Sequence, residues 1–269
     1  MPDQAEPVDP AWSGRTVIVT GSTRGIGEAT ARLFAQSGAT VIVHGRDRRA
    51  GDRLVTGITE VGGSAHFVAA DLLSPDGPAS LVEAAMDFTG RLDVLINNAG
   101  ANVFRGVLDA TVEDWQDCLD LDLRAVWLGA AAAARVMLHP AAIVNVSSNH
   151  AYSTMPGVFP YNVAKAGLLA LTQSLALELA PRGIRVNTVC PGYIDTPINV
   201  DYFATFPDPV AERRRVEQLH PIGRIGTADE VARAIRFLAS ERDSGFTTAS
   251  TLLLDGGRSA LMQDPTPEF

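Results

Sequence analysis

Tyr161 and Lys165 stand four residues apart in the string Y-N-V-A-K, and Ser148 lies thirteen residues before the tyrosine. Positions i and i+4 of a helix lie on the same face, so the phenol and the ammonium can share one pocket. A nearby ammonium lowers the pKa of a phenol, which lets a tyrosine move a proton near neutral pH. A serine hydroxyl beside them could hold the substrate oxygen that gains or loses that proton. These residues predict the interconversion of an alcohol and a carbonyl.

The same spacing also occurs in ordinary surface pairs, so the interpretation depends on the elements that position these residues. Short apolar runs alternate with longer helical patterns, which is typical of a parallel sheet covered by helices on both faces. The runs are rich in β-branched residues, as strands buried on both faces are. The expected strands are 16–20, 40–44, 65–69, 93–97, 142–147, 184–189 and 251–255. The clearest expected helices are 26–37, 78–89, 111–137, 161–181 and 228–240.

These patterns predict a single α/β domain at 15–258, a Rossmann-type doubly wound sheet of seven parallel strands with helices on both faces. Residues 1–14 are acidic and rich in proline and are expected to form a disordered tail, and residues 259–269 a second tail. The region 195–226 contains several prolines, aromatic residues and an arginine-rich helical stretch. It follows the carboxyl end of a strand, so a substrate lid is favoured over a disordered insertion.

The composition narrows the range of partners. The net charge of −9 argues against nucleic acid or an anionic membrane as the main partner. Cys118 and Cys190 have no CxxC spacing, which favours free thiols over a metal site or a redox pair. No apolar run reaches the ~18 to 20 residues that span a bilayer, and the first residues lack the features of a signal peptide. We therefore expect a cytoplasmic protein with a small-molecule substrate.

A glycine-rich string, T-G-S-T-R-G-I-G, joins the first expected strand to the first expected helix. Gly21, Gly25 and Gly27 allow a tight turn and let backbone amides approach a pyrophosphate at the helix N-terminus. A lone glycine-rich turn is weak evidence, but between a strand and a helix at the start of this strand pattern it predicts a dinucleotide site.

The cofactor type is expected to depend on the end of the second strand. NAD-selective sites place an acidic residue there, whereas this chain reads H-G-R-D, with Arg46 after the strand and Arg24 in the glycine loop. Two guanidiniums at one corner suit a phosphate dianion. The sequence therefore predicts NADP, with NAD possible, since the arginines could also face solvent and Asp47 could oppose their charge.

The chain resembles the classical short-chain dehydrogenase/reductases over nearly the whole sequence from Arg15 to Gly257. The matching strings, in chain order, are T-G-S-T-R-G-I-G, Asp71, N-N-A-G at 97–100, S-S at 147–148, Y-N-V-A-K at 161–165, N-T-V-C-P-G-Y-I-D-T-P at 187–197 and D-G-G at 255–257. Each string is modest alone, but their order and spacing together leave little room for coincidence.

The resemblance implies a role for each matching residue. Tyr161 would be the general acid/base, Ser148 rather than Ser147 would bind the reacting oxygen, and Lys165 would lower the pKa of the tyrosine and bind the nicotinamide ribose. The cofactor would be bound by Gly21, Thr23, Arg24, Gly25, Ile26, Gly27, Arg46, Asp71, Leu72, Asn98, Ala99, Gly100, Tyr161, Lys165, Pro191, Gly192, Ile194 and Thr196. A homotetramer or homodimer is also implied, with the helices at 111–137 and 161–181 buried between subunits.

One position departs from the family pattern. The family usually carries an asparagine seven residues after a helix tryptophan, as a fourth catalytic residue, and counting from Trp115 gives Asp122. The added carboxylate is expected to place a negative charge near Lys165 and so to change the pH profile. A tolerated near-isostere is the alternative.

The substrate pocket is expected to be lined by Asn102, Asn149, His150, Met155 and Tyr193, together with lid residues such as Tyr202 and Phe203. An asparagine and an imidazole near the reacting carbon favour a sugar, a polyol or another small polar substrate, although His150 could instead be structural. The string S-S-N-H resembles the bacterial glucose-type dehydrogenases of this family.

Two other functions remain open at the level of sequence. The first is a 3-oxoacyl-thioester reductase, whose acidic carrier would contact the basic residues Arg213 to Arg215 and Arg224. The second is a non-catalytic NADP-binding regulator, which the intact Ser148, Tyr161 and Lys165 disfavour. No metal site is predicted.

Overall fold

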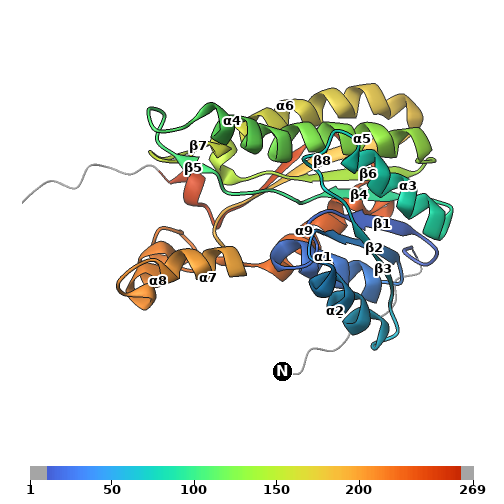
Figure 1. Ribbon diagram of the computed structural model, residues 1–269, viewed down its shortest axis with the longest axis horizontal. Coiled ribbons are helices and arrows are strands. Elements are labelled where there is room, and N and C mark those ends of the chain that lie inside the picture. The colour runs from blue at the N-terminus through green and yellow to red at the C-terminus, as the bar shows by residue number, and fades with distance from the viewer. Residues whose placement is uncertain (1–10, 262–269) are drawn as a thin grey trace, which may run out of the picture.

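The computed structural model describes residues 11–261, which form one α/β domain around a central sheet of seven parallel strands (Figure 1). The strand order is β11-β8-β6-β4-β1-β2-β3. The bounds are β1 Thr16–Val19, β2 Thr40–Gly45, β3 Ser64–Ala69, β4 Val94–Asn97, β6 Ala141–Val146, β8 Ile184–Pro191 and β11 Thr251–Leu254. All seven predicted strands are present, and the predicted fold class is confirmed. The order reverses between β1 and β4, and the crevice at such a point is where open α/β sheets bind ligands.

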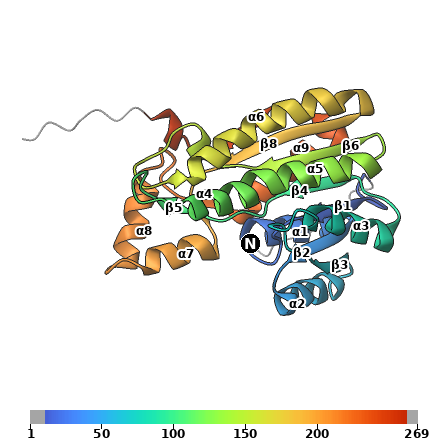
Figure 2. The same cartoon turned by 45° about the horizontal axis from the view of Figure 1, so that its top comes forward.

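Alternate residues of each strand face opposite sides of the sheet, and the two sides build two separate cores. Val17 and Val41 contribute to one core, which α1 (Gly25–Gln36), α2 (Arg48–Thr59) and α9 (Ala228–Ala239) cover. Ile18, Ile42 and Leu95 contribute to the other, under α3 (Gly77–Thr89), α5 (Ala125–Val136) and α6 (Tyr161–Leu179). Figure 2 shows α5 and α6 side by side on their face of the sheet. The inner strands β1, β4, β6 and β8 are buried along their whole length, whereas the edge strands β3 and β11 are partly exposed.

The predicted helix at 111–137 is interrupted. It consists of α4 (Val112–Leu119), a π-helical turn η1 (Asp120–Arg124) and then α5. Single π turns inside α-helices occur often at functional sites. The α2 helix was not predicted, and neither were α7 (Pro197–Ala204) and the short α10 (Glu241–Ser244).

The region 195–226 forms a small subdomain at one end of the molecule (Figure 1). It contains α7 and the arginine-rich α8 (Pro209–Gln218), which was expected as a helix. Phe203, Val216 and Ile225 form its own apolar cluster. The strand pair β9 (Ile194–Asp195) and β10 (Gly226–Thr227) closes its base. The segment therefore leaves the sheet after β8 and returns to it as one packed unit.

The chain ends were expected to be tails, at 1–14 and 259–269. Residues 1–10 and 262–269 lie outside the described part of the chain. Within that part, Trp12 is buried and packs edge-on against Phe34, with ring centroids 4.8 Å apart. At the other end, Arg258–Ala260 forms a 3₁₀ turn, η4. The ordered structure thus extends beyond both expected boundaries, to Trp12 at one end and to the 3₁₀ turn at the other.

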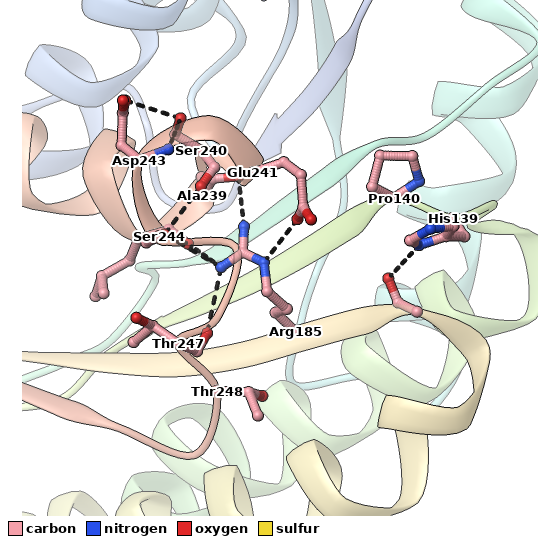
Figure 3. A network of polar contacts seen from close by, with 12 residues as sticks. His139, Pro140, Arg185, Ala239, Ser240, Glu241, Asp243, Ser244, Thr247 and Thr248 are labelled. Carbon is pink, nitrogen blue, oxygen red and sulfur yellow. Dashed lines mark hydrogen bonds and ion pairs between the residues drawn. The ribbon is translucent and has the colours of Figure 1, made fainter.

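Arg185 at the start of β8 fixes the connection that leads to the edge strand β11 (Figure 3). Its guanidinium donates hydrogen bonds to the carbonyl oxygens of Leu238 and Ala239 at the end of α9, at 2.8 and 3.1 Å, and pairs with Glu241 at 3.0 Å. It also donates to Ser244 Oγ, at 3.2 Å. A cation at these orphan carbonyls complements the helix dipole. This buried arginine therefore holds the loop that precedes the D-G-G string.

The helix α6, with the 3₁₀ turn η3 that follows it (Ala180–Arg182), is long and apolar enough to cross a membrane by length and composition, with a mean hydropathy of 1.3. The sequence expectation concerned an unbroken apolar run, which α6 is not, because it contains Lys165 and Glu178. The helix packs along β8 and contains Tyr161 and Lys165 in its first turns. A helix packed on a sheet satisfies the same criterion, so the finding alone does not place the chain in a membrane.

Candidate active site

One cavity of about 820 Å³ opens at the carboxyl ends of the strands, beside the point where the strand order reverses. Apart from Phe203, every residue that the sequence singled out for catalysis, cofactor binding or substrate binding lines it. The cavity extends from the glycine loop and Arg46 at one end to Tyr161, His150 and Tyr202 at the other. Parallel strands bring their carboxyl ends to one edge of the sheet, so motifs far apart in the chain meet there.

The glycine loop fits a dinucleotide. Gly21 and Gly25 have φ angles of 62° and 59°, which L side chains rarely adopt. A Cβ on Gly21 would lie 2.9 Å from the Cα of Ala99, so the loop packs directly against the N-N-A-G segment. The α1 helix begins at Gly25, and no side chain caps its N-terminus. Its first N–H groups are therefore available to a pyrophosphate, as the family cofactor requires.

His44, at the end of β2, holds this loop in place and was not predicted. Its Nδ1 accepts a hydrogen bond from the backbone N–H of Gly21 at 3.0 Å, so the ring proton is on Nε2, which donates to the carbonyl of Ala70 at 3.1 Å. Burial lowers the pKa of His44, while the bond to Ala70 opposes that shift. The sequence feature that could have identified His44 is its position at the carboxyl end of a predicted strand. His44 thus ties the phosphate loop to the end of β3.

We expect His44→Leu to weaken dinucleotide binding about 10-fold, because the Gly21 N–H loses its acceptor and the loop loses its support. The dissociation constant is measured by fluorescence titration with the reduced nicotinamide cofactor. His66→Leu is the matched control, since His66 stacks on Phe88 and does not line the cavity. Equal affinities in the His44 variant and the wild type would show that the loop is held by other contacts.

The catalytic residues come together as the spacing predicts. Tyr161 and Lys165 share one face of α6, with Nζ 5.4 Å from the centre of the phenol ring. Ser148 caps the 3₁₀ turn η2 (Asn149–Ala151), where its Oγ accepts from the N–H of His150 at 3.2 Å. Ser147 instead donates to the carbonyl of Lys165 at 2.8 Å, which makes it a structural residue. Both serines line the cavity, but Ser148 is the one whose hydroxyl hydrogen-bonds the side chain of Tyr161.

The pKa of Tyr161 corrects one expectation. Burial raises the pKa of the phenol above its usual value, and this outweighs the lowering by Lys165 and Ser148. The carboxylate of Asp122 raises that pKa further. Within the protein alone, the pKa of the tyrosine is therefore not lowered toward neutral pH, because burial outweighs the charge of Lys165.

Asp122 lies in the π-helical turn and forms a buried ion pair with Lys165. Its Oδ1 is 2.9 Å from Nζ, with the two side chains 0% and 6% exposed. The other carboxylate oxygen accepts from the N–H of Ala101 at 3.3 Å, and Nζ also donates to the carbonyl of Val146 at 3.3 Å. Burial lowers the pKa of Lys165, but Asp122 more than reverses this and raises it to about 12. Lysine therefore stays protonated, with its charge compensated.

The two arginines at the cofactor end are exposed. Among residues 11–261, neither Arg24 nor Arg46 makes a side-chain hydrogen bond or an ion pair, and both line the cavity. Asp47 caps α2 by accepting from the N–H groups of Arg49 and Ala50, at 2.9 and 3.2 Å. Its carboxylate is thus engaged at a helix N-terminus, and the guanidiniums remain unpaired.

The substrate end is more apolar than the sequence predicted. Phe104, in the short β5 (Phe104–Arg105), and His150 both pack edge-on against Tyr161, with centroids 5.3 and 6.2 Å from that ring. β5 pairs with β7 (Phe159–Pro160), which leads into α6. The further apolar and aromatic lining consists of Met155, Val158, Tyr193, Ile198 and Tyr202. Sequence reasoning missed Phe104, Val158 and Ile198, which belong to no motif.

The polar side chains expected to contact a substrate are partly engaged within the protein. His150 bonds Thr154 through Nδ1 at 3.3 Å, and Asn149 is buried beside Ser259 at 3.4 Å. Asn102 lines the cavity from an exposed position. Phe203 was expected in the lining but is buried in the α7–α8 cluster instead, because its ring packs against Val216 and Ile225.

Known proteins resemble this chain over nearly its whole length. Residues 21–259 match a family described as enoyl-(acyl carrier protein) reductase. The chain is 41% identical over 248 residues to 3beta-hydroxysteroid dehydrogenase 1 of Eggerthella lenta, covering 91% of this chain and 93% of the relative. It is 36% identical over 252 residues to glucose 1-dehydrogenase 2 of Bacillus subtilis, covering 91% and 95%. It is 36% identical over 250 residues to a 3-oxoacyl-(acyl-carrier-protein) reductase of Synechocystis, covering 92% and 98%.

A solved structure agrees with these relatives. A double mutant of a Serratia marcescens short-chain dehydrogenase/reductase superposes with a TM-score of 0.86 at 30% identity, covering 93% of this chain and 99% of that one. The names of the relatives differ in substrate. The chain thus belongs to the classical short-chain dehydrogenase/reductases, oxidoreductases that act on alcohol donors and use nicotinamide cofactors.

Proposed function

We propose that this protein interconverts a secondary alcohol and a ketone on a largely apolar, ring-shaped substrate of the hydroxysteroid class, with NADP(H) as cofactor. The observation that carries the substrate class is the ring of aromatic and aliphatic side chains around Tyr161, with Phe104 and His150 packed edge-on against the phenol. Burial lowers the pKa of His150, so its imidazole presents a neutral wall near pH 7. The hydroxysteroid dehydrogenase relative supports the same class.

Residues of the protein transfer the proton to and from the substrate oxygen. A bound nicotinamide supplies or accepts the hydride at the substrate carbon. In the reductive direction Ser148 donates a hydrogen bond to the carbonyl oxygen, and Tyr161 gives its phenolic proton to that oxygen. Lys165, protonated throughout, stabilises the phenolate that remains. In the oxidative direction the phenolate takes the proton from the alcohol.

A sugar or polyol is the second candidate. Asn102 and Asn149 line the same cavity and can bond hydroxyl groups, and one relative is named a glucose 1-dehydrogenase. A 3-oxoacyl thioester on an acidic carrier is less favoured, although one relative is named for that activity. Arg213, Arg215 and Arg224 would form its basic docking patch, but they pair with Asp195, Glu212 and Glu230 at 2.6 to 2.7 Å.

The test is a substrate panel with purified protein, in which the absorbance of NADPH reports turnover. The panel contains a 3β-hydroxysteroid, glucose and a simple polyol, which are tested for oxidation, and a 3-oxoacyl thioester, which is tested for reduction. Turnover of the steroid with a kcat/KM at least about 10-fold above that of glucose supports the proposal. A preference for glucose or for the thioester would replace the substrate class, and silence across the panel would favour a non-catalytic NADP-binding protein.

The proposed NADP preference rests on the unpaired arginines. We expect the double variant Arg24→Ala/Arg46→Ala to raise KM for NADPH about 10- to 100-fold, the loss typical of hydrogen bonds to a charged group. KM for NADH should change by less than about 3-fold. Arg49→Ala is the matched control, since Arg49 lies on α2 outside the cavity. Equal losses for both cofactors would contradict a role for the arginines in binding the 2′-phosphate.

We also propose a homotetramer and a cytoplasmic location, as the sequence predicted. Only 28% of the most apolar part of α6 is buried within one chain. Leu177 on α6 and Trp127 on α5 are 74% and 52% exposed, and these two helices lie side by side. A face of this kind favours contact with a second copy. Light scattering after gel filtration measures the mass directly.

A further inference from the structure

Arg124 is a partly buried cation on the π turn η1, and its side chain reaches from that turn to a distant loop of the cavity wall. Its Nη2 donates to the carbonyl oxygen of Leu73 at 2.7 Å, and its Nη1 pairs with Asp120 at 3.0 Å. Within residues 11–261, its Nε is buried without a hydrogen-bond partner. Burying a charged group is costly, so the bonds of the two outer nitrogens offset that cost and hold the guanidinium in one orientation.

The loop that Arg124 contacts follows β3, and its residues from Ala70 to Leu73 all line the cavity. At the start of the loop, the Nε2 of His44 donates to the carbonyl of Ala70 at 3.1 Å. At its end, Arg124 binds the carbonyl of Leu73, while the N–H of Leu73 donates to the side chain of Asp71 at 3.1 Å. The loop is therefore held at both ends by side chains that belong to other elements of the fold.

This loop lies at the end of the cavity where the adenosine half of a dinucleotide belongs. Hydride transfer requires the nicotinamide beside Tyr161 and Ser148, and the pyrophosphate fits the N-terminus of α1. The adenosine then extends to the opposite end, which Arg46 and the loop line. Arg124 does not line the cavity itself, so it can act on the adenosine site only through the loop.

The same π turn also contributes to the catalytic end of the cavity. Asp122, two residues before Arg124, pairs with Lys165 at 2.9 Å. Side chains two residues apart on a helix do not face each other, so one turn can contact both sites. The turn η1 therefore joins the catalytic lysine to the loop at the adenosine end, and Arg124 is its contact with that loop.

We propose that Arg124 is a positioning residue for the adenosine half of the dinucleotide, because it fixes the Leu73 carbonyl and with it the loop that lines the adenosine site. NAD and NADP share the adenine, so the loss of Arg124 weakens both cofactors alike. This differs from the effect expected for Arg24 and Arg46, which is confined to NADP. The inference requires a nicotinamide cofactor but neither the proposed substrate class nor the proposed NADP preference.

The experiment measures the dissociation constants of NADPH and NADH by fluorescence titration, and their displacement by ADP-ribose, which carries the adenosine but no nicotinamide. We expect Arg124→Met to weaken all three about 10-fold, with kcat at saturating cofactor within about 3-fold of the wild type. Arg124→Lys should recover part of the loss, since it keeps a charged donor but not the fork. Arg53→Met controls for the change in net charge, because Arg53 is exposed on α2 and does not line the cavity.

The outcomes separate positioning of the adenosine from a general role in folding. Unchanged affinity for ADP-ribose, or a loss confined to NADPH, would overturn the inference. A fall in kcat as large as the loss of cofactor affinity would also overturn it, since Arg124 would then act through Asp122 and the π turn as a whole. If Arg124→Met does not fold, Arg124→Lys decides: a smaller loss shared by the three ligands supports the inference, and no loss overturns it. The titrations need no substrate, so a failure of the proposed substrate class leaves their outcome intact.

Discussion

Replacing Tyr161 with phenylalanine lowers kcat by at least about 10²-fold, the contribution typical of a positioned general acid. The variant removes one oxygen and retains the ring that packs against Phe104 and His150. The ion pair of Lys165 with Asp122 does not involve the phenol and remains. The loss should therefore appear in kcat, with the dissociation constant of NADPH within about 3-fold of the wild type.

The measurement is steady-state turnover of the best substrate of the panel, together with a titration of NADPH. Tyr152→Phe is the matched control, because Tyr152 is 55% exposed and does not line the cavity. A Tyr161 variant with near-normal kcat would remove the tyrosine from the mechanism and leave Ser148 or a water as the proton donor.

The sheet was predictable because its signal is local. Continuous runs such as V-I-V in the first two strands are apolar and β-branched, and burial on both faces requires no other pattern. The α2 helix was missed because its sequence contains glycines and β-branched residues, which weaken a helical pattern. Its stability comes instead from the cap by Asp47 and from Leu54 and Ile58 in the core.

The cavity lining was predictable where a motif marks it, since each motif lies at the carboxyl end of a strand of the sheet, except Y-N-V-A-K, which lies at the start of α6. Phe104 and Ile198 belong to no motif. Their positions in the cavity lining depend on how a loop and the α7 segment fold back over the sheet. The pKa shift of Tyr161 also could not be predicted from the sequence. The i, i+4 spacing predicts that Lys165 lies near the phenol, but not that burial outweighs its charge or that Asp122 pairs with the ammonium.

The ion pair suggests that Asp122 sets the pH at which the enzyme works. Asp122→Asn removes the carboxylate that raises the pKa of Tyr161 and leaves the ammonium of Lys165 as the main charge near the phenol. We expect the pH at which oxidation reaches half its maximal kcat/KM to fall by about 1 unit, the lower end of the range for one neighbouring charge. Asp120→Asn is the matched control, since Asp120 lies in the same π turn but pairs with Arg124 at 3.0 Å in a half-exposed position. An unchanged pH profile would make Asp122 a tolerated substitute for asparagine.

The same variant tests stability independently of turnover. Removing one partner of a buried pair costs up to about 3–5 kcal/mol, and the retained amide oxygen, which can still accept from Lys165, should reduce this to about 1–3 kcal/mol. The folded pKa of Lys165, about 12, lies above its value in the unfolded chain. The stability that the pair contributes is therefore fully present at neutral pH and is lost only as the pH rises through the folded pKa. Urea unfolding at pH 7 and pH 9 should show the same loss at both values, whereas a loss that differs between them would mean that a group other than Lys165 is linked to Asp122.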